Sequence, residues 1–266
     1  MKKMTVSRGV LGIPYLVFQL LFIVLPLLVI VYYAFTDGQG QFSVENFAGF
    51  FINSRTMGTL VYSFGIALTT TAVCLFIAYP VALVLARGGY KKSHVLLMLF
   101  VMPMWINFAL RITALKEILT VLEGNLAYHP FFNTIVGMTY DFLPFMILPI
   151  YNTIVKIDNS YIEAAVDLGA KRSSVLFRIL LPLSMPGIVS GVTMVLLPSM
   201  TNYVVLDMLY NSTYIMGSLI GSYFASYDWH NGSVISLVLL FLILLFSLIS
   251  GEFTEEKVEE GGGRRG

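Results

Sequence analysis

Charged side chains are scarce in this sequence of 266 residues. Asp, Glu, Lys and Arg together make up 12% of the chain, 57% of the residues are hydrophobic, and the mean hydropathy is +0.82. Because soluble domains carry about 25% charged residues, this composition excludes an ordinary water-soluble fold. The net charge of +1 and the lack of a basic tract interleaved with aromatic residues argue against a nucleic-acid partner. We therefore expect a chain whose surroundings are a lipid bilayer.

Several kinds of site chemistry are also missing. The single cysteine, Cys74, excludes a disulfide framework and a cysteine-based metal site within one chain. The sequence contains no G-x-x-x-x-G-K-[ST] phosphate loop, no H-E-x-x-H motif and no G-x-S-x-G motif. We therefore expect no catalytic residues, no metal site and no cofactor in this chain.

Apolar stretches long enough to cross a membrane recur along the chain. A spanning helix needs about 20 apolar residues. Six candidates lie at about residues 10–35, 58–86, 94–115, 134–155, 184–206 and 233–250. The first is too long for the apolar core of a signal peptide and has no small-x-small cleavage site after it, so we expect it to remain as a helix. The sequence thus predicts an all-α membrane protein with six transmembrane helices.

Positive side chains are concentrated in alternate loops. The N-terminal segment, the second and fourth loops and the C-terminal tail hold thirteen of the sixteen Lys and Arg residues. By the positive-inside rule, both termini are expected in the cytoplasm. We predict a single transmembrane domain over residues 1–250, with a long fourth loop at about 156–182, followed by a polar, disordered cytoplasmic tail over 251–266.

The fourth loop has the pattern of a short helix. The sequence Ser160-x-x-Glu163 is typical of a capping box at the start of a helix, and Gly169 is typical of a helix end. The small apolar face between them consists of Ala164, Ala165 and Leu168. A second amphipathic stretch begins near residue 173 or 174 and runs to Pro182. On pattern alone, such a helix suits a groove on a partner protein and the lipid headgroups equally well.

The same loop resembles the signature of binding-protein-dependent ABC importer permeases, Glu-Ala-Ala-x3-Gly-x9-Ile-x-Leu-Pro. Every fixed position is present, at Glu163, Ala164, Ala165, Gly169, Ile179, Leu181 and Pro182. The resemblance implies a type I ABC importer fold, in which this loop forms coupling helices that fit a cleft on the ATP-hydrolysing subunit. It assigns ATPase coupling to Glu163, Ala164, Ala165, Leu168 and Gly169.

The resemblance also implies a complex in a bacterial plasma (inner) membrane. Its other members are an ABC ATPase dimer, which binds ATP and magnesium, a second, similar permease subunit, and an extracytoplasmic protein that delivers the solute. The present chain is then a multi-pass permease in contact with lipid, and is not itself an enzyme.

Four further segments resemble the spermidine/putrescine permease subfamily, specifically its B-type subunit. They are Pro103-Met-Trp105-Ile-Asn107-x3-Arg111-Ile, Leu143-Pro144-Phe-Met-x-x-Pro149-x-Tyr151, Met185-Pro-Gly-Ile188 and Leu197-Pro-Ser-Met-x5-Leu206-Asp207. The resemblance covers most of the chain between residues 46 and 220 and implies uptake of a polyamine. The fifth loop and Asp141 depart from the subfamily pattern.

The residues suited to a polyamine pathway could equally serve structural roles. Ammonium groups need carboxylates and aromatic faces in place of water, which suggests Trp105, Asp141, Tyr203 and Asp207. Asp141 could instead pair with Arg111 between the third and fourth spans, and Asp207 could lie in water. Two rival functions stay open: a permease for another cation, an anion or an iron complex, and an ATP-independent transporter or channel. The second rival gives no reason for the fourth-loop pattern.

Overall fold

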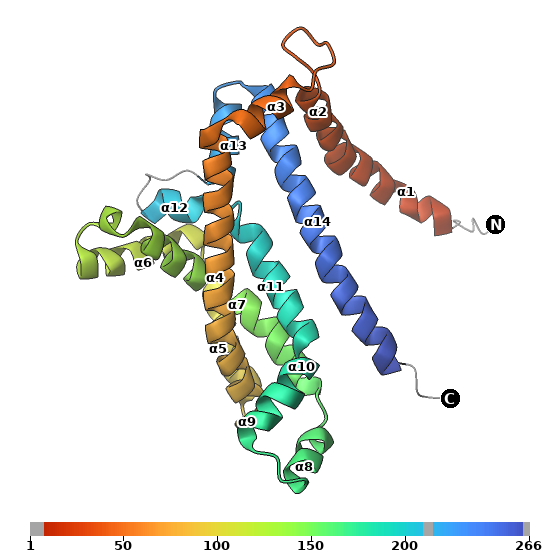
Figure 1. The fold of residues 1–266 in the computed structure, drawn as a ribbon, viewed down its shortest axis with the longest axis vertical. Helices are drawn as coiled ribbons and strands as arrows, with labels where there is room; N and C mark the ends of the chain where they lie inside the picture. The colour runs from red at the N-terminus through yellow and green to blue at the C-terminus, as the bar shows by residue number, and fades with distance from the viewer. Residues whose placement is uncertain (1–7, 210–214, 263–266) are drawn as a thin grey trace, which may run out of the picture. The chain divides into compact units, whose positions relative to one another are not determined.

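The computed structural model describes the backbone of residues 8–209 and 215–262, and the side chains of 12–209 and 215–248. The regular elements in this part of the chain are helices (Figure 1), and one isolated β-bridge joins Thr36 to Phe42. The helices divide between two compact units. The first unit comprises the described residues up to Gly58 together with Leu219–Leu242; the second comprises Thr59–Ser218 and the chain from Ile243.

The six predicted spans correspond to six helical segments. Four helices are long and apolar enough to cross a membrane, and they lie at Gly12–Ala34, Ser54–Arg87, Pro130–Lys156 and Trp229–Leu248. Two bent pairs complete the six if each pair is one span: Ser93–Trp105 with Phe108–Glu123, and Arg172–Leu183 with Met185–Ser199. The prediction of an all-α chain with several membrane spans is confirmed.

The first unit contains the N-terminal span and shorter helices. They are α1 (Arg8–Gln19), the π-helical turn η1 (Leu20–Val24), α2 (Leu25–Ala34), α3 (Glu45–Ile52), the part of α13 (Met216–Ala225) from Leu219, and the part of α14 (Trp229–Gly262) up to Leu242.

The second unit holds the remaining helices. In chain order they are α4 (Ser54–Arg87) from Thr59, α5 (Ser93–Val101), η2 (Met102–Trp105), α6 (Phe108–Glu123), η3 (Leu126–Tyr128), α7 (Pro130–Lys156), α8 (Asn159–Asp167), α9 (Arg172–Val175), η4 (Leu176–Leu180), α10 (Leu181–Leu183), α11 (Met185–Ser199) and α12 (Val204–Leu209). Helix α7 is central, since α5, α6, α11 and α12 all pack against it. Its fully buried side chains include Met138, Met146, Ile147, Ile150 and Ile154.

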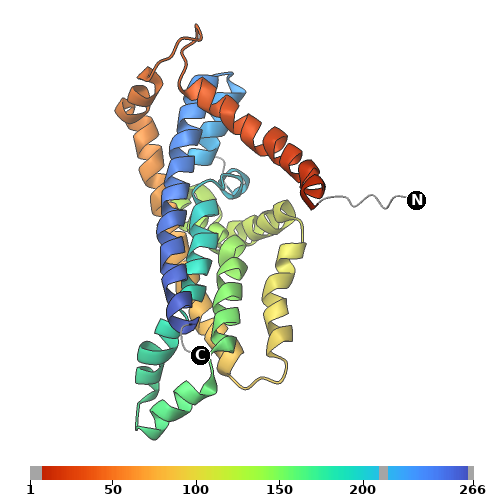
Figure 2. The same cartoon turned by 90° about the vertical axis from the view of Figure 1, so that its right-hand side faces the viewer.

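The third span, predicted for residues 94–115, is bent into two helices. Helix α5 continues into the 3-10 turn η2, and α6 then leaves at an angle of 97° (Figure 2). The break lies at Ile106, whose backbone is extended. Asn107 starts the new helix, because its side-chain oxygen accepts a hydrogen bond from the backbone N–H of Ala109 at 2.9 Å. A proline at position 103 and this N-cap together account for the bend.

Two helices, α11 and α14, end at other residues than those predicted for their spans. The fifth span was expected to reach residue 206, whereas α11 ends at Ser199 and a turn separates it from α12. Helix α14, which contains the sixth span, continues past residue 250 into the predicted polar tail and ends at Gly262. Glu and Lys are good helix formers, and no proline interrupts this stretch, so a helix that leaves the span can continue into it. The last predicted tail residues, 263–266, lie outside the described residues.

In the described part of the chain, each of the two π-helical turns comes just before a proline. In η1 the N–H of Leu25 donates to the carbonyl oxygen of Leu20, and Pro26 follows; η4 ends in the same way before Pro182. A proline has no N–H, and its ring clashes with the carbonyl four residues earlier in an α-helix. A wider turn moves that carbonyl away from the ring, so the helix continues past the proline.

Helices α7 and α11 approach each other closely through two glycines. A Cβ atom on Gly187 would lie 2.5 Å from Thr153 Oγ1 and 2.7 Å from the carbonyl oxygen of Pro149. One turn further along α11, a Cβ atom on Gly191 would lie 2.7 Å from the sulfur of Met146. The spacing G-x-x-x-G is the one that lets two membrane helices bring their backbones together.

We predict that Gly187→Ala destabilises the protein, because the added methyl group would overlap α7. Overpacking of this kind costs about 1–3 kcal/mol. The midpoint of thermal denaturation in detergent, followed by loss of the monodisperse fraction, should fall by several degrees. Gly65→Ala on α4 is the matched control, because no atom lies within 4 Å of a Cβ there. Equal midpoints for the two variants would contradict the proposed close packing.

Candidate functional site

The fourth loop begins with α8, whose first turn differs from the predicted capping box. The N-cap is Asp158 and not Ser160: a carboxylate oxygen of Asp158 accepts a hydrogen bond from the backbone N–H of Ser160 at 2.9 Å. This bond to the backbone lowers the pKa of the Asp158 carboxyl below its ordinary value. The missed signal was an aspartate two residues before the serine, since Asp caps helices as well as Ser does.

The end of α8 lies where the sequence predicted it. Gly169 has a φ of +78°, which an L side chain rarely adopts. Its N–H donates to the carbonyl oxygen of Val166 at 2.8 Å, and the N–H of Ala170 donates to that of Ala165 at 2.9 Å. These two bonds form a Schellman motif, which satisfies the last carbonyls of the helix.

Helix α8 presents its middle and its end to the outside. Glu163 and Ala164 are exposed, Ala165 is half-buried, and the side chain of Leu168 is 89% exposed. The loop extends beyond the ends of α7 and α11 (Figure 1). A leucine side chain that is almost fully exposed, beside small residues at the tip of a loop, is a suitable contact for another protein.

The second arm of the loop is a helical stretch from Arg172 to Leu183, close to the predicted bounds. Its buried side chains include Val175 and Leu180. It meets α11 at a bend of 64°. The fully buried Ser184 lies at this bend, with its hydroxyl oxygen 3.3 Å from the hydroxyl of Tyr79 on α4.

A second group of predicted residues lies inside the helix bundle. The Nη2 atom of Arg111 lies 2.7 Å from Oδ1 of Asp141, and the two residues are 8% and 6% exposed. The pair joins α6 to α7. Of the two roles that the sequence left open for Asp141, the structure has the ion pair with Arg111.

Asn202 is a partner that sequence reasoning missed. Its side-chain nitrogen lies 3.4 Å from the second carboxylate oxygen of Asp141. The guanidinium of Arg111 also lies 6.0 Å from the ring centre of Phe108 and 5.9 Å from that of Tyr140. Asn202 belongs to the turn between α11 and α12, so a residue 61 positions away completes the cluster. No local pattern indicates such a contact.

The other predicted pathway residues lie nearer the surface. Tyr203 is 40% exposed and Asp207 is also exposed; Tyr203 lies just before α12, and its carbonyl oxygen accepts a hydrogen bond from the N–H of Asp207 at 3.0 Å. Helix α12, which carries Asp207, packs on both α6 and α7. Trp105 is 81% exposed and lies at the end of η2, beside the break between α5 and α6.

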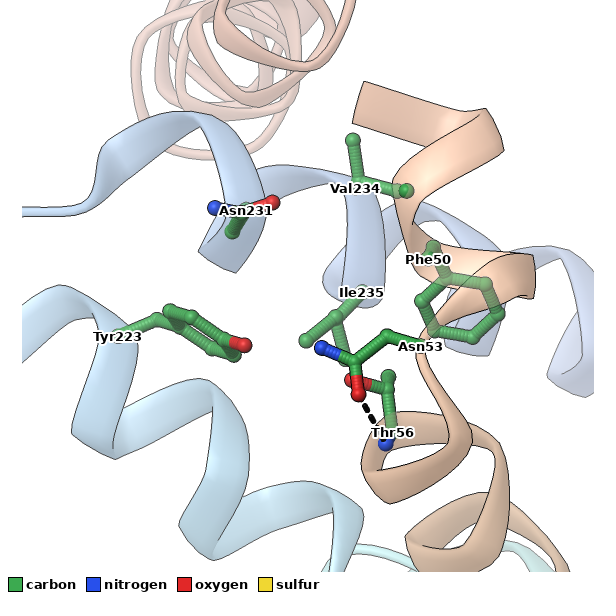
Figure 3. A pocket seen from close by; sticks show the side chains of 8 residues that line it. Phe50, Asn53, Thr56, Tyr223, Asn231, Val234 and Ile235 are labelled. Atoms are coloured by element: carbon green, nitrogen blue, oxygen red, sulfur yellow. Dashed lines mark hydrogen bonds between the residues drawn. The ribbon is translucent and has the colours of Figure 1, made fainter. Parts of the chain in front are cut away.

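A small polar cavity in the first unit contains none of the predicted residues. Its volume is about 20 Å³, which is room for a single water molecule. Figure 3 shows the amide of Asn53 and the hydroxyl of Tyr223 among its lining groups, with Asn53 Oδ1 accepting from the N–H of Thr56 at 3.4 Å. Among the described residues, no group of three or more His, Cys, Asp and Glu side chains could hold a metal ion.

We predict strong energetic coupling between Arg111 and Asp141. Asp141→Leu alone leaves a buried guanidinium without its counter-charge, which costs about 3–5 kcal/mol. Arg111→Leu alone should cost a similar amount, and the double variant should cost much less than the sum. Thermal denaturation midpoints of the four proteins in detergent measure the coupling. Additive losses would show that the ion pair does not hold α6 to α7.

Residues 78–253 of the chain match the family described as "Binding-protein-dependent transport system inner membrane component". The matched segment contains α7, the whole fourth loop and α11.

Three curated relatives are similar over most of their length. Each is a spermidine/putrescine transport system permease protein PotB. The protein of Haemophilus influenzae is 34% identical over 265 residues, which cover 90% of this chain and 92% of the relative. That of Escherichia coli is 34% identical over 219 residues, covering 75% and 80%. That of Salmonella typhimurium is 32% identical over 271 residues, covering 94% of both.

Two solved ABC transporters have a similar fold. A bacterial importer of the acidic polysaccharide alginate has a TM-score of 0.70 at 15% identity, covering 93% of this chain and 94% of the other. The MetNI methionine transporter has a TM-score of 0.56 at 20% identity, covering 77% and 99%. At these identities the similarity shows the shared fold alone.

Proposed function

Since this chain belongs to the family of binding-protein-dependent transport system inner membrane components, we propose that it forms the membrane pathway of a polyamine importer. As a member of that family, the chain is a multi-pass permease subunit of an ABC importer, and it is not the enzyme of the system. Its proposed solutes are spermidine and putrescine. The observation that carries this choice is similarity to permeases of that name over almost the whole chain.

The proposed solute contacts are on the exposed residues. The ion pair with Arg111 occupies Asp141, which leaves Asp207 as the exposed carboxylate of the two. Tyr203, just before α12, can offer an aromatic ring to an ammonium group, and Trp105 is a third candidate from the neighbouring helix break. The same ion pair argues against an anion as the transported solute, because the charge of Arg111 is already balanced by Asp141.

The proposed coupling element is α8, which we call the coupling helix. A cytoplasmic ATPase dimer, which binds the ATP and magnesium, would grip the exposed surface around Glu163, Ala164 and Leu168. Gly169 and Ala165 belong to the turn that ends the helix, and so keep that surface in place. A second permease subunit and a binding protein outside the membrane would complete the importer.

We predict that the complete importer, reconstituted in vesicles, takes up labelled spermidine and putrescine when ATP is enclosed. Asp207→Asn should raise the KM for spermidine about tenfold, because a charge-assisted contact worth about 1.5 kcal/mol is lost. Asp228→Asn is the control: it makes the same change at a half-buried carboxylate whose contacts are with Asn231.

Labelled sulfate, an amino acid and an iron chelate complete the panel of solutes. Uptake of one of these instead of the polyamines would show that the permease serves a different solute. An unchanged KM in Asp207→Asn would remove that residue from the pathway.

We predict that Glu163→Lys and Gly169→Trp each abolish ATP-driven uptake while the protein stays in the membrane. The first reverses a charge on the exposed surface of the coupling helix, and the second forces a large side chain into a left-handed backbone conformation. The measurements are ATP-driven uptake of labelled spermidine and the amount of ATPase that co-purifies with the permease. Glu117→Gln on α6, also an exposed carboxylate, should leave both unchanged. Normal uptake in both loop variants would rule out this coupling surface.

A further inference from the structure

Arg87, the last residue of α4, holds the corner between α7 and the coupling helix. Its Nη2 atom donates to the carbonyl oxygen of Ile154 at 2.9 Å and to that of Ile157, and its Nη1 atom donates to the side-chain oxygen of Asn159. Helix α7 ends at residue 156 and α8 begins at Asn159. One guanidinium therefore bridges the short link between the two helices and ties both to the end of α4.

The chemistry of this corner suits arginine specifically. The last carbonyls of a helix have no donor within the helix and carry the negative end of its dipole. A guanidinium presents five N–H groups in a rigid plane, so it can satisfy several such acceptors at once, whereas a lysine offers a compact charge. The side chain of Arg87 is half-buried, and its Nε atom is buried without a partner among the described residues.

The second arm of the fourth loop is also attached to α4. Tyr79 lies two helical turns before Arg87 on α4, and its hydroxyl contacts Ser184 at the bend where that arm meets α11. Both arms of the loop are thus fastened to one helix, the first through Arg87 and the second through Tyr79. The ends of α4 and α7 lie together where the loop emerges (Figure 1).

We propose that Arg87 is a positioning residue that makes the coupling helix and the ends of α4 and α7 move as one body. A displacement of α8 by the ATPase is then passed to two membrane helices and is not absorbed by bending at Ile157 and Asp158. This proposal rests on the proposed function, because it takes α8 as the ATPase contact.

The test uses the complete importer in vesicles, with Arg87→Ala, Arg87→Lys and Asn159→Ala. Three quantities are measured: ATP hydrolysis, solute transported per ATP hydrolysed, and co-purification of the ATPase. In Arg87→Ala, hydrolysis and co-purification should persist while transport per ATP falls about fivefold or more, the lower end of couplings between distant sites. Arg87→Lys should recover only part of the loss. Asn159→Ala, which removes one of the hydrogen bonds, should lower the ratio about twofold or more.

Lys91→Ala is the matched control, since it removes an exposed cation from the loop that follows α4 and should leave the ratio unchanged. An unchanged ratio in Arg87→Ala would overturn the proposal. A parallel loss of hydrolysis and assembly in both Arg87 variants, with a normal ratio in Asn159→Ala, would reduce Arg87 to a folding role and also overturn it. Failure of the unmodified complex to transport any solute with ATP would overturn the proposed function itself, and this proposal with it.

Discussion

Membrane helices gain little by exchanging lipid for protein, so they are held together by close van der Waals contact and by a few polar bonds. In the second unit one such close contact is between α7 and α11, where Gly187 and Gly191 leave no space for a side chain. These two helices are also the ones that the fourth loop connects. The distance between the two arms of the fourth loop is therefore set by the packing of α7 on α11. The same packing determines the position of the exposed coupling helix.

Two arginines make polar bonds between helices of the second unit, and they do so in opposite ways. Arg111 is buried against a carboxylate, so its contribution depends on a strong attraction that offsets the cost of removing both charges from water. Arg87 binds neutral carbonyl and amide oxygens at the rim of the bundle, where the cost of burial is smaller. The first holds α6 to α7 within the bundle, and the second holds the corner from which the loop departs. Removing either arginine would loosen the contacts of α7, the central helix of the second unit.

The parts of this molecule that were predictable are those that depend on local sequence. Hydrophobic stretches indicated six spans because each span must bury its own backbone in lipid. Gly169 indicated the end of a helix because its conformation is restricted by the residue itself. The ion pair of Arg111 with Asp141 was foreseen as one of two possibilities, since isolated opposite charges at membrane depth seek each other.

What could not be predicted depends on contacts between distant segments. Asn202 reaches Asp141 only because a turn brings it there, and Arg87 reaches Ile154 only because two helices end side by side. The bend at Ile106 is a different case: a proline inside the span favours a kink, but the sequence gives neither the residue at which the helix breaks nor the angle of 97°. A spanning segment is recognised from the average hydrophobicity of about 20 residues, whereas the place of a helix break is decided by one or two residues.

The π-helical turns before Pro26 and Pro182 have a consequence for comparing relatives of this chain. Each turn contains one residue more than an α-helical turn, and one residue rotates the face of a helix by about 100°. A relative without the proline could omit that residue and keep the same side chains facing the same neighbours. A single-residue gap at such a turn would then mark a change of helix type, with the register of the flanking segments preserved.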